Sequence, residues 1–209
     1  MSRRLLLATS NAHKTAEVQA MLGSEWRVED LRAHPDLTSP EEDGTTFEAN
    51  ARIKAEAASA ALPGLLVLAD DSGLEVDALD GAPGVHSARY AGASATDADN
   101  RQRLKQELRQ LGSPGPFTGR FRCCLALARD GQTLTTCHGA VEGTLLTEEA
   151  GSGGFGYDPL FVPDGFSTTF GLLPAEEKNT LSHRSRALQQ MLRWLEQSLT
   201  FDDSSCPPH

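Results

Sequence analysis

An apolar run that ends in two adjacent acids constrains this 209-residue chain more than any other feature of its sequence. Residues 65–69, Leu-Leu-Val-Leu-Ala, have the length and composition of a short buried strand. Asp70 and Asp71 follow, so we expect them at the strand's carboxyl end, where open α/β sheets hold ligands. Ser72-Gly73 is expected to turn the chain there. Such a cluster suits a divalent cation and a phosphate-bearing substrate. The alternative is a polar turn whose Asp side chains only cap backbone N–H groups.

Strand and helix patterns recur along the rest of the chain. Apolar or alternating runs predict further strands at residues 4–8, 74–79, 117–129 and 133–143. Asp130-Gly131 is a hairpin-turn signal between the last two. Capping residues, helix formers and apolar stripes predict helices at residues 12–22, 44–61, 96–111 and 182–199. We find no repeat and no dividing linker, so we expect one domain over residues 1–200 and a disordered tail over 201–209.

Composition and charge exclude several classes of function. Hydrophobic residues make up 39% of the chain and charged residues 23%, as in a globular protein. The net charge of −10 argues against a nucleic-acid or anionic-membrane surface, although a local cation cluster can still bind a small anion. We find no signal peptide and no run approaching 18 apolar residues. The four cysteines form no CxxC pair, which favours reduced thiols in a cytoplasmic protein.

A candidate phosphate-binding turn lies between the first predicted strand and the first predicted helix. Its residues are Thr9, Ser10, Asn11, Ala12, His13 and Lys14. The N–H groups and the dipole of a helix start attract phosphate, and Lys14 adds a point charge. The turn is not a Walker A loop, because no glycine precedes Lys14. An ordinary capped surface helix is the alternative.

An acidic cluster, Glu41-Glu42-Asp43, stands directly before the second predicted helix. Acids at this position complement the helix dipole, which is the simpler interpretation. The functional interpretation is a ligand for a hard cation that works together with Asp71.

Residues 153–159 read Gly-Gly-Phe-Gly-Tyr-Asp-Pro. Glycines on both sides of Phe155 allow close backbone approach and leave the ring exposed. An exposed ring is a stacking platform for a nucleobase. The alternative is a glycine-rich turn whose Phe155 ring packs in the core.

Three hydrogen-bond donors gather in the segment 176–186, near the start of the last predicted helix. They are Lys178, His183 and Arg184. Such a trio can hold phosphate or donate to a carbonyl oxygen on a base. The alternative is a solvated charged face.

Together and in this order, these segments resemble the inosine/xanthosine triphosphate pyrophosphatase family, which acts on noncanonical purine nucleoside triphosphates. The resemblance runs from about Leu5 to Leu195. The segments ADDSGLEVDALDGAPGVHSARYAG, GFGYDPLFVPDG and EEKNTLSHR carry it. It implies an α/β fold with a mixed central sheet, helices on both faces, and two lobes with the active site in the cleft between them.

The resemblance also implies an activity. Members of that family hydrolyse ITP, dITP and XTP to the monophosphate and pyrophosphate with Mg²⁺. This reaction removes deaminated purines from the nucleotide pool. The members are typically homodimers, so we expect the same of this chain.

Residue by residue, the resemblance assigns the phosphate turn Thr9–Lys14 to substrate binding, and Ser72 to a substrate contact. Glu42 and Asp71 match metal ligands. Asp71 also matches the acid that accepts the proton of the attacking water. Lys54 and Arg89 fall in family-like stretches and are second-tier phosphate or structural residues.

The base pocket and the nucleotide contacts match residues of the two later segments. These are Phe155 as the stacking ring, Gly156, Tyr157, Asp158, Lys178, His183 and Arg184. Arg184 or His183 would donate to the 6-carbonyl of hypoxanthine or xanthine, which leaves an unpaired donor opposite adenine. Guanine has the same carbonyl, so its rejection depends on the 2-position, for which Asp158 is a candidate sensor.

The sequence departs from the family pattern at a few positions, and two other functions compete with the main one. Many relatives have glycine in place of Ser10 or His13, and often Ala-Glu where this chain has Gly171-Leu172. His13 is bulkier and adds a donor or narrows the pocket. One competing function is a pyrophosphatase for other modified nucleotides. The other is a nucleotide-binding sensor, which would not need a water-activating acid beside a metal.

Overall fold

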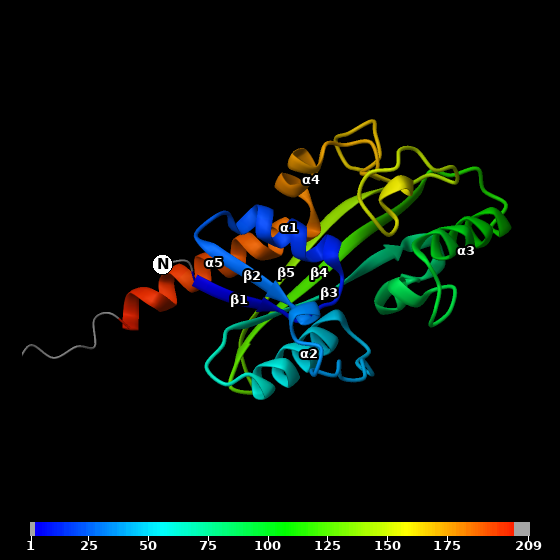
Figure 1. Ribbon diagram of the computed structural model, residues 1–209. Helices are drawn as coiled ribbons and strands as arrows, with labels where there is room; N and C mark the ends of the chain where they lie inside the picture. The colour runs from blue at the N-terminus through cyan, green and yellow to red at the C-terminus, as the bar shows by residue number, and fades with distance from the viewer. Residues whose placement is uncertain (1–2, 203–209) are drawn as a thin grey trace, which may run out of the picture.

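The computed structural model describes residues 3–202, and a six-stranded mixed sheet runs through them. The strand order is β2-β1-β3-β4-β5-β6 (Figure 1). β1 (Arg3–Leu7) pairs in parallel with β2 (Trp26–Asp30) and with the start of β3 (Val67–Val76). The mixed α/β fold that the resemblance implies is confirmed.

The second half of the sheet is antiparallel. β4 (Phe117–Arg129) pairs with all of β3, β5 (Gln132–Leu145) pairs with β4, and β6 (Phe161–Pro163) pairs with the end of β5. Asp130 and Gly131, with φ of 53° and 77°, make the predicted hairpin turn between β4 and β5. Both strand predictions are therefore confirmed within two residues.

Helices cover both faces of the sheet. α1 (Ala12–Leu22) and α5 (His183–Asp202) pack on one face, where Leu5, Leu7 and Leu68 meet their apolar stripes. α2 (Phe47–Ala61) packs on the other face. Small side chains of α2, such as Ala51 and Ala55, let it lie close to β3 and β4.

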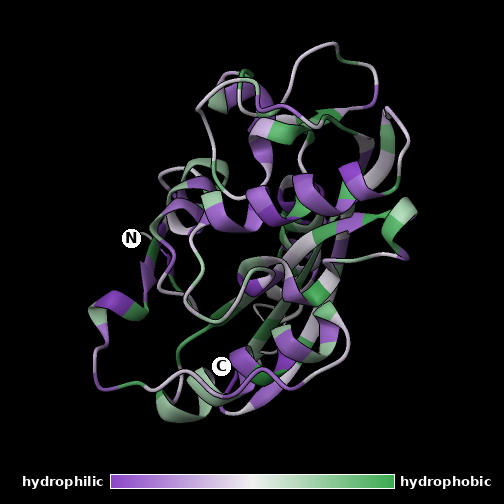
Figure 2. Cartoon of the chain, turned by 90° about the vertical axis from the view of Figure 1, so that its right-hand side faces the viewer, coloured by the Kyte–Doolittle hydropathy of each residue, from purple (hydrophilic) through white to green (hydrophobic). Residues whose placement is uncertain are grey.

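A separate core cluster lies where the end of β3 pairs with the start of β4. α3 (Asp97–Gln110) buries Leu104 and Leu108 there and presents hydrophilic residues on the side seen in Figure 2. Its start has the predicted Thr96 cap, in a capping box with Asp99. The short helix α4 (Ala175–Leu181) leads into α5, whose cap is Ser182, as predicted. None of the described helices combines the length and apolar character needed to cross a membrane.

The prediction of a turn at Ser72-Gly73 was wrong. β3 continues through these residues to Val76, because β4 supplies a hydrogen-bonding partner for each of them. The two strands expected at 65–69 and 74–79 are thus one. Gly73 serves close packing instead, since a Cβ there would lie 2.4 Å from the carbonyl oxygen of Gly84. Asp70 and Asp71 therefore lie within a strand and not at its carboxyl end.

The sequence analysis did not predict the short strands β2 and β6 or the short helix α4. Helix α5 extends to Asp202 and so includes the first two residues of the segment expected to be disordered. The rest of that expectation concerns residues 203–209, which lie outside the described residues.

Candidate active site

The two acids of β3 leave opposite faces of the sheet, as adjacent residues of a strand must. Asp70 points toward α1 and α5, whereas Asp71 points toward α2. β1 pairs with β3 only as far as Leu68, so the strand edge beside both acids has no β1 partner. Lys14 from one face and Lys54 from the other reach the carbonyl oxygen of Asp70, at 3.4 and 3.1 Å. One open strand edge therefore joins two charged clusters.

Asp70 is the centre of the first cluster. Its buried carboxylate accepts from Lys14 Nζ at 2.5 Å and from Arg184 Nε at 2.8 Å. Ser72 Oγ donates to the same carboxylate at 2.8 Å. Burial opposes ionisation, but the charges of Arg184 and Lys14 outweigh it and hold the pKa of Asp70 well below its ordinary value. Asp70 is thus a fixed negative charge under two cations.

Asp71 and Glu42 form the second cluster around one ammonium group. Lys54 Nζ lies 2.7 Å from Asp71 Oδ1 and 2.9 Å from Glu42 Oε2. Burial raises the pKa of Asp71, Lys54 offsets part of that rise, and nearby Glu42 adds to it. Burial also acts on Glu42, but Lys54 outweighs it and lowers the pKa of that carboxyl. Asp71 is therefore the more basic of the two carboxylates.

The second cluster contains both predicted metal ligands, Glu42 and Asp71, and its donor set suits Mg²⁺. The carboxylates of Glu42 and Asp71 both approach one position, and the ammonium group of Lys54 occupies it. Mg²⁺ is commonly held by one or two carboxylates together with substrate phosphates and water. The described residues contain no group of three or more His, Cys, Asp or Glu side chains arranged for a metal. Substrate oxygens would have to complete the coordination.

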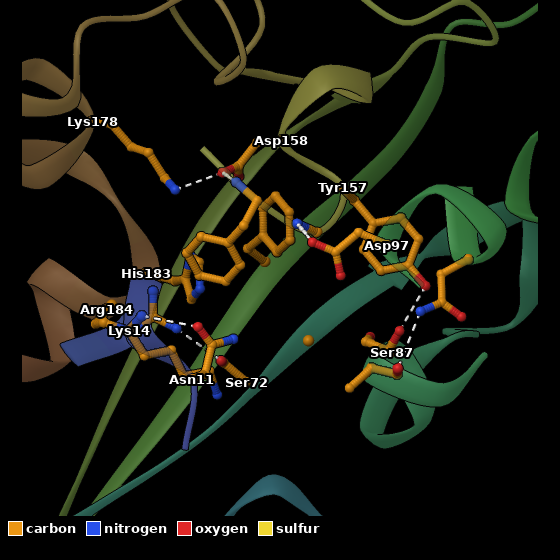
Figure 3. A pocket seen from close by; sticks show the side chains of 16 residues that line it. Asn11, Lys14, Ser72, Ser87, Asp97, Tyr157, Asp158, Lys178, His183 and Arg184 are labelled. Carbon is orange, nitrogen blue, oxygen red and sulfur yellow. Dashed lines mark hydrogen bonds and ion pairs between the residues drawn. The ribbon is translucent and has the colours of Figure 1, made fainter. Parts of the chain in front are cut away.

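A cavity opens on the Asp70 side of the sheet, between α1, α5 and the loop before β6 (Figure 3). Predicted substrate-binding residues that line it are Asn11, Lys14, Ser72, Phe155, Gly156, Tyr157, Asp158, Lys178, His183 and Arg184. Phe155 is half-buried, with Lys178 Nζ 4.8 Å and Arg184 Cζ 5.6 Å from its ring centroid. The cavity therefore combines an aromatic surface with cations.

A chain of alternating charges runs along the wall of this cavity. In order, its members are Lys14, Asp70, Arg184, Glu17, Lys178 and Asp158. Glu17 Oε2 lies 2.5 Å from Arg184 Nη1, and Glu17 Oε1 lies 2.8 Å from Lys178 Nζ. Lys178 Nζ lies 2.6 Å from Asp158 Oδ2. The helix that carries Lys14 thus also holds Arg184 and Lys178 through Glu17.

His183 contributes a neutral imidazole to the cavity. Burial and then the charge of Arg184 hold its pKa well below the ordinary value. The ring stacks on Phe121, with centroids 5.0 Å apart and an interplanar angle of 14°. Its buried Nδ1 has no hydrogen-bond partner within the described residues. A buried nitrogen of this kind favours a ligand that supplies the missing hydrogen bond.

The phosphate turn is only partly in the cavity. Thr9, Ser10, Ala12 and His13 do not line it. Asn11 Oδ1 caps α1 by accepting from the N–H groups of His13 and Lys14, so these groups already have a partner. The exposed His13 ring stacks on Phe155, with centroids 5.6 Å apart. Arg89 donates to the carbonyl oxygen of Glu42 at 3.3 Å, and its contact is therefore with the loop that carries the acid.

Comparison with known proteins places the chain in a family. The model of the Ham1 family matches residues 5–194. The chain belongs to the Ham1 family.

Relatives within the Ham1 family cover nearly the full chain. This chain is 45% identical over 192 residues to the dITP/XTP pyrophosphatase of Halalkalibacterium halodurans. That alignment covers 91% of this chain and 98% of the relative. The chain is 47% identical over 189 residues to the dITP/XTP pyrophosphatase of Geobacter sulfurreducens, covering 88% and 92%. The structure of a HAM1 protein from Coxiella burnetii aligns with a TM-score of 0.81 and 39% identity, covering 93% of this chain and 99% of that one.

Several residues of this site received no specific role from the sequence. They are Asp70, Glu17, Ser87, Asp97, Asn100 and Phe121. Glu17 had a usable signal, because it lies three positions after Lys14 on the same helical face. Asp70 had one in its pairing with Asp71. Ser87 lies in the same resemblance segment as Asp71, but nothing in its local pattern marked it as a site residue. Asp97, Asn100 and Phe121 belong to segments that the sequence does not connect to the motif.

Proposed function

We propose that this chain is a Mg²⁺-dependent nucleoside-triphosphate pyrophosphatase. It would hydrolyse ITP, dITP and XTP to the monophosphate and pyrophosphate, and so remove deaminated purines from the nucleotide pool. One observation carries the proposal: a cation-lined aromatic cavity and a carboxylate pair meet at the open edge of β3. The names and the extent of the Ham1 relatives support the choice of substrate.

The geometry suggests a separate role in the reaction for each group of residues. The base would stack on Phe155, and the phosphates would cross the strand edge between Lys14 and Lys54. Water would attack, the α–β phosphoanhydride bond would break, and pyrophosphate would leave with the bridging oxygen. Glu42 and Asp71 would hold Mg²⁺, which supplies charge neutralisation to the phosphates. Asp71 would accept the proton of the attacking water.

Base selection would depend more on His183 than on Arg184. The guanidinium of Arg184 is fully buried and donates to Asp70, Glu17 and Ser72. Each of its three nitrogens thus already donates to a group inside the protein. The neutral His183 has a free Nδ1 in the cavity and would supply the donor to a 6-carbonyl. An adenine amine there would leave that donor unpaired, which disfavours ATP.

The test is pyrophosphate release from ITP, XTP, GTP and ATP, each with Mg²⁺ and with EDTA. We expect metal-dependent release from ITP and XTP far above that from GTP and ATP. Release from all four would contradict the account of base selection. Tight ITP binding without release would favour a sensor, and activity on other modified nucleotides alone would favour the alternative pyrophosphatase.

A substitution tests the role of Asp71. Asp71→Asn should remove turnover and leave the fold intact, because the amide is isosteric but cannot accept a proton. Circular dichroism and thermal unfolding check the fold. The exposed Asp164→Asn is the matched control, and it should keep wild-type activity. Near-wild-type turnover by Asp71→Asn would exclude the proposed role.

Three features implied by the resemblance belong to this proposal as well. They are the homodimer, the cytoplasmic location and the two-lobed arrangement of one domain over residues 1–200. Light scattering on the purified protein tests the dimer directly. A mass of one chain at micromolar concentration would contradict it.

A further inference from the structure

The ring proposed to stack on the base belongs to a glycine-rich loop. Residues 151–156 read Gly-Ser-Gly-Gly-Phe-Gly, and Gly156 has a φ of +60°. Glycine loses more conformational freedom on ordering than any other residue. The position of Phe155 must therefore be fixed by contacts from other parts of the chain.

The N-terminal part of α3 supplies such contacts. Asp97 Oδ2 accepts from the N–H of Gly156 at 2.7 Å, and Arg101 Nη1 donates to the carbonyl oxygen of Gly156 at 2.8 Å. Arg101 Nε also lies 3.0 Å from Glu149 Oε2, just before the loop. α3 thus holds the loop at its beginning and at its end.

Two carboxylates hold two consecutive amides on either side of the Phe155 Cα. The N–H of Phe155 donates to Asp158 Oδ2 at 2.8 Å, and the next N–H donates to Asp97. These two N–H groups belong to the two peptide planes that meet at the Phe155 Cα, so holding both of them restricts φ and ψ of Phe155. Figure 3 shows Asp97 beside Tyr157, on the wall of the cavity across from Lys14 and Arg184.

We propose that Asp97 is a positioning residue for nucleotide binding, which holds the Gly156 amide so that Phe155 presents its ring to the base. The inference rests on the function proposed above. No hydrogen bond joins Asp97 to the phosphate turn or to the cluster of Glu42 and Asp71 within the described residues. Its loss should therefore weaken substrate binding and leave the chemical step nearly unchanged.

The experiment compares three variants in steady-state hydrolysis of ITP. Asp97→Ala removes the contact, and Asp97→Asn keeps an oxygen that accepts the same N–H. Asp99→Ala is the matched control. It lies in the same turn, and its carboxylate accepts from the N–H and hydroxyl of Thr96 at 2.8 and 2.6 Å, so it supports α3 without touching the loop.

Asp97→Ala should raise KM for ITP roughly tenfold, which corresponds to about 1.4 kcal/mol, with kcat changed much less. Asp97→Asn should return KM close to the wild-type value. Asp99→Ala should lower Tm through loss of the cap and leave KM unchanged. Equal KM values for Asp97→Ala and Asp99→Ala would overturn the proposal, as would a loss confined to kcat.

A second measurement does not require turnover. Hydrogen–deuterium exchange of a peptide covering residues 151–158 should be faster in Asp97→Ala than in the wild type or in Asp99→Ala. Unchanged exchange would overturn the positioning role. If the wild type released no pyrophosphate from any nucleotide, the proposed function would fail, and this measurement would still decide whether Asp97 holds the loop.

Discussion

Asp70→Asn is expected to destabilise the protein more than any conservative change of a surface acid. The side chain of Asp70 is fully buried, and each of its hydrogen-bonding neighbours is a donor. These neighbours are Lys14, Ser72, Cys123 and Arg184. Whichever way the carboxamide of Asn turns, its NH₂ group meets N–H, O–H or S–H donors. Two cations also lose their shared counter-charge.

The size of the effect follows from that burial. Removing one partner of a buried ion pair costs about 3–5 kcal/mol, out of a total stability of about 5–15 kcal/mol for a typical domain. With a urea m-value of about 2–3 kcal/mol/M, the midpoint should fall by about 1–2 M. Urea unfolding followed by fluorescence and circular dichroism measures this shift at pH 7.

The pH dependence provides a second check on the same carboxylate. Its folded-state pKa is lowered, so its stabilising contribution is present above the unfolded pKa of about 3.9 and is lost as pH falls through the folded value. The difference between wild type and Asp70→Asn should therefore stay constant from pH 8 to pH 5 and shrink below about pH 4. A difference that disappears near neutral pH would contradict this.

The control is Asp77→Asn, which changes an exposed carboxylate paired with Arg120. Solvent screens that pair, so its loss should shift the midpoint far less. The reasoning is refuted if Asp70→Asn lies within about 1 kcal/mol of the wild type, or if the two variants behave alike.

Two further predictions concern packing and stacking. Gly139→Ala in β5 would place a Cβ 2.0 Å from the carbonyl oxygen of His183 and 2.7 Å from the nitrogen of Ala187, so α5 must shift. Thermal unfolding should show a Tm several degrees lower, with reduced activity; an unchanged Tm would show that α5 accommodates the methyl group. Phe155→Ala should raise KM for ITP roughly 10- to 100-fold, because stacking on an aromatic ring contributes about 1–3 kcal/mol per base. Its Tm should change little, since the ring is half-buried, and an unaltered KM would exclude Phe155 as the stacking ring.

Elements with strong local signals were predictable from the sequence. The helix over residues 12–22 has the predicted bounds, and Asn11 caps it as one of three adjacent cap-forming residues. The hairpin turn at Asp130-Gly131 has positive φ at both residues, which its residue types favour. In both places the deciding interactions span only a few residues, so the local sequence contains them.

Strand boundaries were less predictable because they depend on the partner strand. Ser72-Gly73 has the composition of a turn, yet both residues are paired with β4 across about 50 positions of sequence. The short strand β6 likewise exists because β5 offers an edge to pair with. A partner that is distant in sequence leaves no signal in the segment itself.

The amino-acid sequence was enough to predict which residue types the site contains and, through the resemblance, which segments carry them. The face of the sheet that each acid of β3 occupies is known only from the folded chain, because the turn expected after these acids does not exist. Only the folded chain also shows that Arg184, 114 positions after Asp70, neutralises that acid, and that Glu17 joins it to Lys178. Electrostatic contacts of this kind depend on distance in space, and the chain brings these charges together only when the open edge of β3 and the helices beside it have formed.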